Sequence, residues 1–395
     1  MIRLAVMVLA AVVGLLVGGA GMLAVERPAS TPTTSLTTST TLAAVTPAPI
    51  PRPEERVLLA WTSGGLPDGF ADRVAGLAEV GAVTLVKGDL VHLVASWGAG
   101  GAVVDSPPEG MLIPLEVASI DPKTYAEFLP ADARPLVVGL GEGEAILGST
   151  SARLRRLGAG GTMELVGGAS LTVVGVVDDA LVGAAELVVA TPTGDELGIT
   201  TPRYVLLTHR GDRSATEGAI EELVSGTPVR VRGPGETPFF RHGDAVLPQA
   251  HIKDRFGEFA YRSEDGTSFS QEPAWTERFI VTTQVPLLGQ VSCHRAFLPA
   301  LEGAMAELVE RSLEHLVDPE GFAGCWNPRL IGPGAGVSRH AWGVAVDLNF
   351  RANPTGLQSS QDPRLVEVME RWGFTWGGFW LVPDPAHFEY LQPPG

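Results

Sequence analysis

The chain has 395 residues, of which 45% are hydrophobic and 18% are charged, and its formal net charge is −17. These values fit two or more folded domains together with an apolar segment, and they exclude a disordered chain. The acidic balance argues against nucleic acid as a partner, because phosphate binding requires clustered Lys and Arg. It also argues against docking on anionic lipid through a basic patch.

The first 27 residues contain an uncharged run at 4–25, LAVMVLAAVVGLLVGGAGMLAV. A run of this length can cross a bilayer as a helix. We expect 1–27 to be a signal anchor in the cytoplasmic membrane, with a cleaved signal peptide as the alternative. Either form places the remaining domains outside the cytoplasm, either tethered or secreted. Residues 28–56, rich in Thr, Ser and Pro, are expected to form an extended linker.

Residues 57–235 are predicted to form an α+β domain with a mainly antiparallel sheet. Its strands are expected at the runs RVLLAW, AVTLVKG, HLVASW, PLVVGL, TMELVGG, SLTVVGVV, AELVVA and YVLLTH. Helical patterns occur at DGFADRVAGLAEV and SATEGAIEELV. The segment from TYAEFLP to LTVVGVV resembles the extracytoplasmic domain of MacB/FtsX-type permeases. The resemblance implies a module without catalysis, whose role would be spacing or binding, for example to a membrane-protein partner.

Residues 236–250 are predicted to be a connector, and residues 251–395 a second, smaller α+β domain with a short antiparallel sheet. Pro299 is expected in the first turn of a helix through ALEGAMAELVERSLEHL. Asp362 and Pro363 are expected to begin a second helix, which continues through LVEVMERW and stops at Gly373. QVSCH, GVAVDLNF and HFEYL are the strand candidates.

The two cysteines of the chain, Cys293 and Cys325, are expected to form a disulfide, because thiols outside the cytoplasm are commonly oxidised. Two buried thiols that do not meet are the alternative.

Two short stretches near the C-terminus concentrate residues that carry chemistry. In SRHAWGVAVDLNF, His340 lies in a turn just before the strand that carries Asp347. In VPDPAHFEYL, Asp384 precedes His387 by three residues. Two histidines and one carboxylate with an open fourth position form a hydrolytic zinc set. A further carboxylate beside such a metal can act as a general base.

These stretches resemble the D-Ala-D-Ala metallopeptidases of the VanY/VanX type and the related L-Ala-D-Glu endopeptidases. SRHAWGVAVD matches the family motif SxHxxGxAxD, and WGGFWLVPDPAHFEY matches the second motif. The resemblance covers roughly residues 275–395. It implies that His340, Asp347 and His387 hold zinc (Zn2+) and that Asp384 is the general base.

The same resemblance implies roles for further residues. Arg329, in CWNPRLIG, would hold the substrate carbonyl or the oxyanion, and Ser338 would help to bind the substrate. Glu389 is expected to orient a metal ligand. Trp376 is a candidate for substrate binding, although core filling is an equal alternative for Trp376 and Trp380.

The sequence therefore predicts a zinc metallopeptidase outside the cytoplasmic membrane that hydrolyses peptidoglycan stem peptides. D-alanyl-D-alanine carboxypeptidase activity is the primary expectation. A stem-peptide endopeptidase and a catalytically silent wall-binding module are the alternatives. The absence of GxSxG and HExxH argues against a serine hydrolase of the elbow type and against a zincin.

Overall fold

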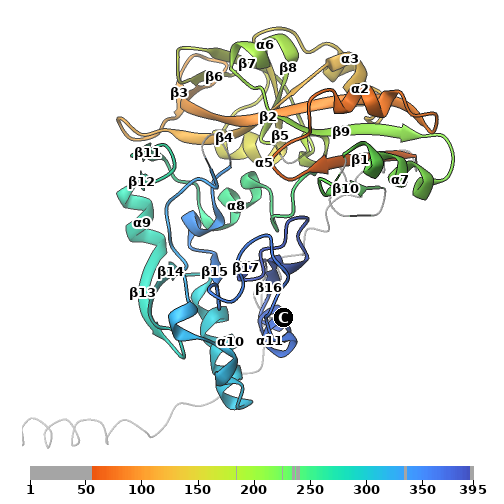
Figure 1. Ribbon diagram of the computed structural model, residues 1–395. Helices are drawn as coiled ribbons and strands as arrows, with labels where there is room; N and C mark the ends of the chain where they lie inside the picture. Colours follow the sequence, from red (N-terminus) through yellow and green to blue (C-terminus); the bar gives the residue numbers. More distant parts are fainter. Residues whose placement is uncertain are drawn as a thin grey trace, which may run out of the picture. The chain divides into compact units, whose positions relative to one another are not determined.

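The computed structural model describes residues 56–183, 185–224, 226–233, 236, 241–332 and 336–391 (Figure 1). The predicted signal anchor at 1–27 and nearly all of the predicted linker at 28–56 lie outside these residues. Among the residues that the structure does describe, no helix is long and apolar enough to cross a membrane.

A ten-stranded mixed sheet is built from the first part of the described chain (Figure 1). In spatial order its strands are β10 (Val229–Arg232), β1 (Val57–Thr62), β9 (Pro202–His209), β2 (Val80–Trp97), β4 (Ile113–Ile120), β8 (Leu187–Ala190), β5 (Glu144–Gly148), β7 (Ser170–Val177) and β6 (Thr162–Leu165), and β3 (Val103–Asp105) pairs with β2. Strand β2 also pairs with β6, which closes a ring of pairings from β2 through β4, β8, β5 and β7 to β6. The pairings are mainly antiparallel, as predicted, but β4–β8 and β5–β7 are parallel.

The sheet differs from the prediction at two places. AVTLVKG and HLVASW belong to one long strand, β2, rather than to two. The strand predicted at PLVVGL is wrong, because Arg134–Val138 forms helix α4 with Pro135 in its first turn, where the missing N–H of proline is not needed. The other helices beside the sheet are α2 (Phe70–Ala75), α3 (Pro122–Ala126), α5 (Ser149–Arg155), α6 (Thr191–Glu196), α7 (Arg213–Leu223) and the 3₁₀ helix η1 (Asp179–Val182).

The C-terminal part combines short helices with three small antiparallel sheets. Its α-helices are α8 (Gln249–Phe256), α9 (Pro273–Phe279), α10 (Leu298–Glu310) and α11 (Pro363–Arg371), and its 3₁₀ helices are η2 (Glu314–Leu316), η3 (Pro319–Gly321), η4 (Arg339–Trp342) and η5 (Gly377–Phe379). The sheets are β11 (Tyr261–Ser263) with β12 (Phe269–Gln271), β13 (Ile280–Val285) with β14 (Gly289–His294), and β15 (Ala345–Asp347) with β17 (His387–Tyr390) and β16 (Phe374–Trp376). The expected α+β class with short antiparallel sheets is confirmed here.

The two predicted helices of this part are present, with different accuracy at their ends. Helix α11 begins as expected, because the Asp362 side chain accepts a hydrogen bond from the backbone N–H of Arg364. Helix α10 has Pro299 in its first turn but ends earlier than predicted. Ser312 takes a left-handed conformation with φ of 57°, which a continuing helix does not tolerate.

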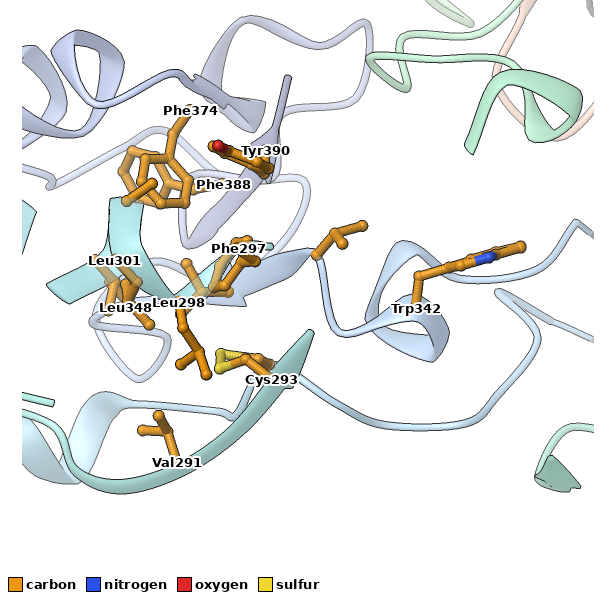
Figure 2. Packing of buried hydrophobic residues seen from close by; sticks show 14 of the residues in the cluster. Val291, Cys293, Phe297, Leu298, Leu301, Trp342, Leu348, Phe374, Phe388 and Tyr390 are labelled. Carbon is orange, nitrogen blue, oxygen red and sulfur yellow. A yellow bond between two sulfur atoms is a disulfide. The ribbon is translucent and has the colours of Figure 1, made fainter. Parts of the chain in front are cut away.

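The core of the C-terminal part is built from residues of α8 to α11 and of the three small sheets. Figure 2 shows Phe297, the residue before α10, and Leu301 of α10 near Phe374, Phe388 and Tyr390. The rings of Phe297 and Phe374 meet edge to face with centroids 5.3 Å apart. Because side chains alternate along a strand, burying Phe388 in this core turns the neighbouring His387 and Glu389 to the opposite face of β17.

Candidate metal centre

The short helix η4 places the first candidate ligand, His340. Ser338 caps this turn, since its Oγ accepts a hydrogen bond of 3.3 Å from the N–H of His340. Gly343 ends the turn with φ of 67°, and a Cβ there would lie 2.8 Å from the backbone nitrogen of His294. A glycine is therefore required at the point where the chain bends from the turn into β15.

Asp347 and His387 come from neighbouring strands, and the strand register brings them together. In the antiparallel pairing of β15 with β17, Asp347 lies directly opposite His387. Directly opposite side chains on one face of a sheet have Cβ atoms about 4.5–5.5 Å apart. The pairing therefore places a carboxylate against an imidazole without any further adjustment of the backbone.

The donor atoms of His340, Asp347 and His387 converge. His340 Nε2 lies 3.3 Å from His387 Nδ1 and 3.4 Å from Asp347 Oδ2, while His387 Nδ1 lies 2.8 Å from Asp347 Oδ1. Three donors bound tetrahedrally to one zinc ion, each at about 2.0–2.1 Å, would lie about 3.3 Å from one another. Both the donor types and their spacing therefore fit a zinc ion held by three protein ligands.

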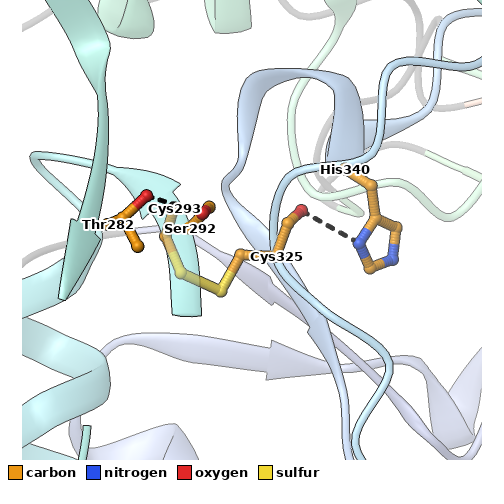
Figure 3. Close-up of a disulfide and its surroundings, with 5 residues drawn as sticks. All are labelled: Thr282, Ser292, Cys293, Cys325 and His340. Atoms are coloured by element: carbon orange, nitrogen blue, oxygen red, sulfur yellow. Dashed lines mark hydrogen bonds between the residues drawn. A yellow bond between two sulfur atoms is a disulfide. The ribbon is translucent and has the colours of Figure 1, made fainter. Parts of the chain in front are cut away.

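In each histidine, the ring nitrogen that does not face the other two candidate ligands forms a separate hydrogen bond. His340 Nδ1 donates to the backbone carbonyl of Cys325 over 3.2 Å (Figure 3), and His387 Nε2 donates to Glu389 Oε1 over 3.3 Å. Such outer hydrogen bonds fix the orientation of a ligating imidazole. Glu389, the predicted orienting residue, therefore contacts the candidate ligand His387.

Burial and hydrogen bonding have opposite effects on the pKa values of Asp347 and His387. Burial alone would raise the pKa of Asp347, but hydrogen bonds from His340 and His387 outweigh it and hold that pKa well below its usual range. Burial would lower the pKa of His387, but its hydrogen bonds with Asp347 and Glu389 raise it to about 10. His387 consequently carries a proton at neutral pH when no cation is bound, and a metal ion would have to displace that proton.

Cys293 on β14 and Cys325 form a disulfide, which fixes the loop whose carbonyl orients His340 (Figure 3). Replacing both cysteines by alanine should lower the free energy of unfolding by about 3–4 kcal/mol, since the bond closes a 32-residue separation in the unfolded chain. Denaturant titration of the double variant and of the oxidised wild-type protein measures the difference. Equal midpoints and slopes would contradict this expectation.

The three candidate ligands line a cavity of about 900 Å³, together with other predicted site residues. Asp384, Arg329, Ser338 and Glu389 all contribute to its wall. The Asp384 carboxylate is half-buried and accepts a hydrogen bond of 3.0 Å from Thr355 Oγ1. The cavity therefore combines a triad that could hold a metal ion with a separate carboxylate that is held in place but does not belong to the triad.

Residues 332–390 match the family model described as D-alanyl-D-alanine carboxypeptidase. This match confirms the predicted family resemblance. It contains both motifs, all three candidate ligands and Asp384. The carboxypeptidase match does not extend over the ten-stranded sheet or over Arg329.

Two solved structures are similar to the chain at low identity. The periplasmic region of MacB from Actinobacillus actinomycetemcomitans is 12% identical, with a TM-score of 0.31, and the alignment covers 46% of this chain and 90% of that one. The extracellular domain of the noncanonic ABC-type transporter YknZ from Gram-positive bacteria is 10% identical, with a TM-score of 0.29, and the alignment covers 45% and 100%. Similarity at this level carries no function over to the chain. No curated protein matches the sequence.

For Trp376 and Trp380 the sequence left core filling and cavity lining as equal alternatives, and the cavity also contains residues outside the motifs. Trp380 lines the cavity, with its ring centroid 5.1 Å from that of His387, whereas Trp376 does not line it. Trp376 packs against the core and donates its indole N–H to the carbonyl of Pro385, so the structure favours the core-filling alternative for this residue. Thr355 and Arg241 were not selected, because neither belongs to a motif. Only spatial proximity identifies them.

Proposed function

We propose that the chain is a zinc peptidase that hydrolyses peptidoglycan stem peptides as a D-alanyl-D-alanine carboxypeptidase, tethered outside the cytoplasmic membrane by residues 4–25. The convergence of His340, Asp347 and His387 beside the separate carboxylate of Asp384 carries this proposal. The carboxypeptidase family match over the same stretch supports it.

The residues divide the work of hydrolysis among them. A zinc ion held by the triad would polarise the scissile carbonyl and lower the pKa of a water molecule. Asp384 would take the proton of the attacking water and pass it to the leaving amine, while Thr355 keeps its carboxylate oriented. Arg329 would donate hydrogen bonds to the carbonyl oxygen as negative charge develops on it. Glu389 and the carbonyl of Cys325 would keep the two imidazoles aligned.

The proposal predicts that the full chain, purified in detergent, releases a terminal D-Ala from defined stem peptides. Release should stop with a chelator, because the triad loses its metal, and should return when zinc is added. Mass spectrometry of the products measures both the loss and the position of the cut.

The other outcomes of this assay separate the alternatives. Cleavage inside the stem would replace the carboxypeptidase by an endopeptidase. Protein that retains one zinc ion and cleaves none of the peptides would indicate the silent wall-binding module. Protein that binds no zinc would refute the proposal as a whole.

A further inference from the structure

Two arginines that line the cavity are buried without contacting a carboxylate among the described residues. Arg241, in the chain that follows β10, and Arg339, at the start of η4, are 7% and 8% exposed. Arg241 donates to the carbonyl of Val246, and Arg339 donates to the carbonyls of Val337 and Leu247. Buried charges in proteins are usually paired, so two guanidinium groups served only by backbone carbonyls are an exception.

The surrounding charges compensate the buried charge of Arg241 only in part. Burial and the nearby charge of Arg339 lower the pKa of Arg241 to about 10. Two carboxylates, those of Glu389 and of Glu116 on β4, interact electrostatically with both arginines, but neither contacts them. Glu389 is already engaged by His387 and by the N–H of Val246, and burial raises the pKa of Glu116.

The two guanidinium groups are fixed close to the metal centre. Arg339 directly precedes His340 in the sequence and donates to the carbonyl of Leu247. The preceding residue, Val246, donates its N–H to Glu389. Arg241 donates to the carbonyl of Val246, so the two guanidinium groups bind the carbonyls of adjacent residues.

The sheet also contributes to the lining of the cavity, including Glu116 and Arg203. All described residues belong to one compact unit. Lys253 of α8 and Glu186, directly before β8, form a fully buried ion pair with Nζ and Oε1 2.7 Å apart. The cavity is therefore lined by both the sheet and the metal-binding part. Its volume of about 900 Å³ lies near the upper end of the usual range for ligand sites, about 300–1,000 Å³.

We propose that Arg241 and Arg339 together bind a carboxylate of the peptide substrate beside the metal centre. This inference rests on the proposed peptidase function. A planar guanidinium presents paired N–H donors that match the two oxygens of a carboxylate. A substrate carboxylate would supply the counter-charge that no carboxylate among the described residues provides by direct contact. Arg241 and Arg339 would thereby determine which peptides are accepted, without touching the scissile bond.

The carboxylate can be the C-terminus of the peptide or an acidic side chain within it, and two pairs of peptides distinguish these sources. One pair differs only in a C-terminal carboxylate or carboxamide, and the other only in an internal Glu or Gln. For one pair, wild-type protein should prefer the acid by about tenfold or more in kcat/KM, as expected for hydrogen bonds to a charged group. Arg241→Gln should reduce that preference to within about twofold, mainly through KM.

Two further variants make the test independent of folding and general charge effects. Arg241→Lys keeps the charge but not the planar fork, so its preference should lie between those of wild type and Arg241→Gln. Arg295→Gln removes an exposed arginine that does not line the cavity, and it should leave the preference unchanged. Melting temperatures show whether each variant is folded. If Arg241→Gln does not fold, Arg241→Lys decides.

Direct binding separates a failure of this inference from a failure of the proposed function. The same peptides are titrated calorimetrically into chelator-treated full chain. If no peptide is hydrolysed but the acid still binds better than its amide, and Arg241→Gln removes the difference, the carboxylate site stands and the peptidase proposal fails. If wild-type protein hydrolyses peptides with the same acid preference as Arg241→Gln for both pairs, the carboxylate site is refuted and the peptidase proposal stands.

Discussion

Replacing His340 by alanine should weaken zinc binding by more than about a hundredfold and reduce peptide hydrolysis in parallel. Losing only an outer hydrogen-bond partner of a metal ligand costs about ten- to a hundredfold, and this substitution removes a ligand itself. His340 is 3% exposed, and its Nε2 faces both Asp347 and His387. The two remaining ligands would leave the ion open to water and to chelators.

The measurement is the zinc content of the full chain after dialysis against a graded series of chelator concentrations, together with hydrolysis of the stem peptides. His315→Ala is the matched control, because His315 is exposed and does not line the cavity. Glu389→Gln should lie between the two, with zinc affinity lowered about ten- to a hundredfold. A His340→Ala protein that retains one zinc ion with unchanged affinity would refute the metal site as we describe it.

The convergence of His340, Asp347 and His387 follows from the sequence because these residues lie on local structure with a strict geometry. Because side chains alternate along a strand, HFEYL predicts His387 and Glu389 on one face, and in the structure a hydrogen bond joins them. Gly343, the first residue of GVAVD, allows the bend after His340, and the register of β15 with β17 places Asp347 opposite His387. A two-residue spacing within one strand, and a turn directly before another strand, are properties that a sequence encodes directly.

The surroundings of the centre could not be predicted in the same way. Arg241 reaches the cavity from a segment about a hundred residues before His340 in the sequence, and Glu116 reaches it from a strand of the sheet. Both positions depend on how the sheet packs against α8, which rests on long-range pairs such as Lys253 with Glu186. PLVVGL shows the related limit for local structure. A short apolar run is equally compatible with a strand and with a helix, and Pro135 at the helix start favours the helix.

The second large effect is expected at Asp384. Asp384→Asn should lower kcat by about 10²–10⁴-fold, the usual contribution of a general base, while zinc content stays at the wild-type level. The amide is nearly the same size as the carboxylate, and its oxygen can still accept the hydrogen bond from Thr355. It cannot take a proton from water, so the loss should fall on kcat rather than on KM. Steady-state kinetics on a stem peptide, combined with metal analysis of the same preparation, measure both quantities.

Thr355→Val provides the comparison that isolates orientation from proton transfer. It removes the hydroxyl that holds Asp384 Oδ1 but leaves the carboxylate itself, so kcat should fall far less than in Asp384→Asn. Because Asp384 stands apart from the converging donors of His340, Asp347 and His387, neither variant should release zinc. An Asp384→Asn protein with wild-type kcat would remove this residue from the mechanism. Loss of zinc in the same variant would instead make Asp384 part of the metal site.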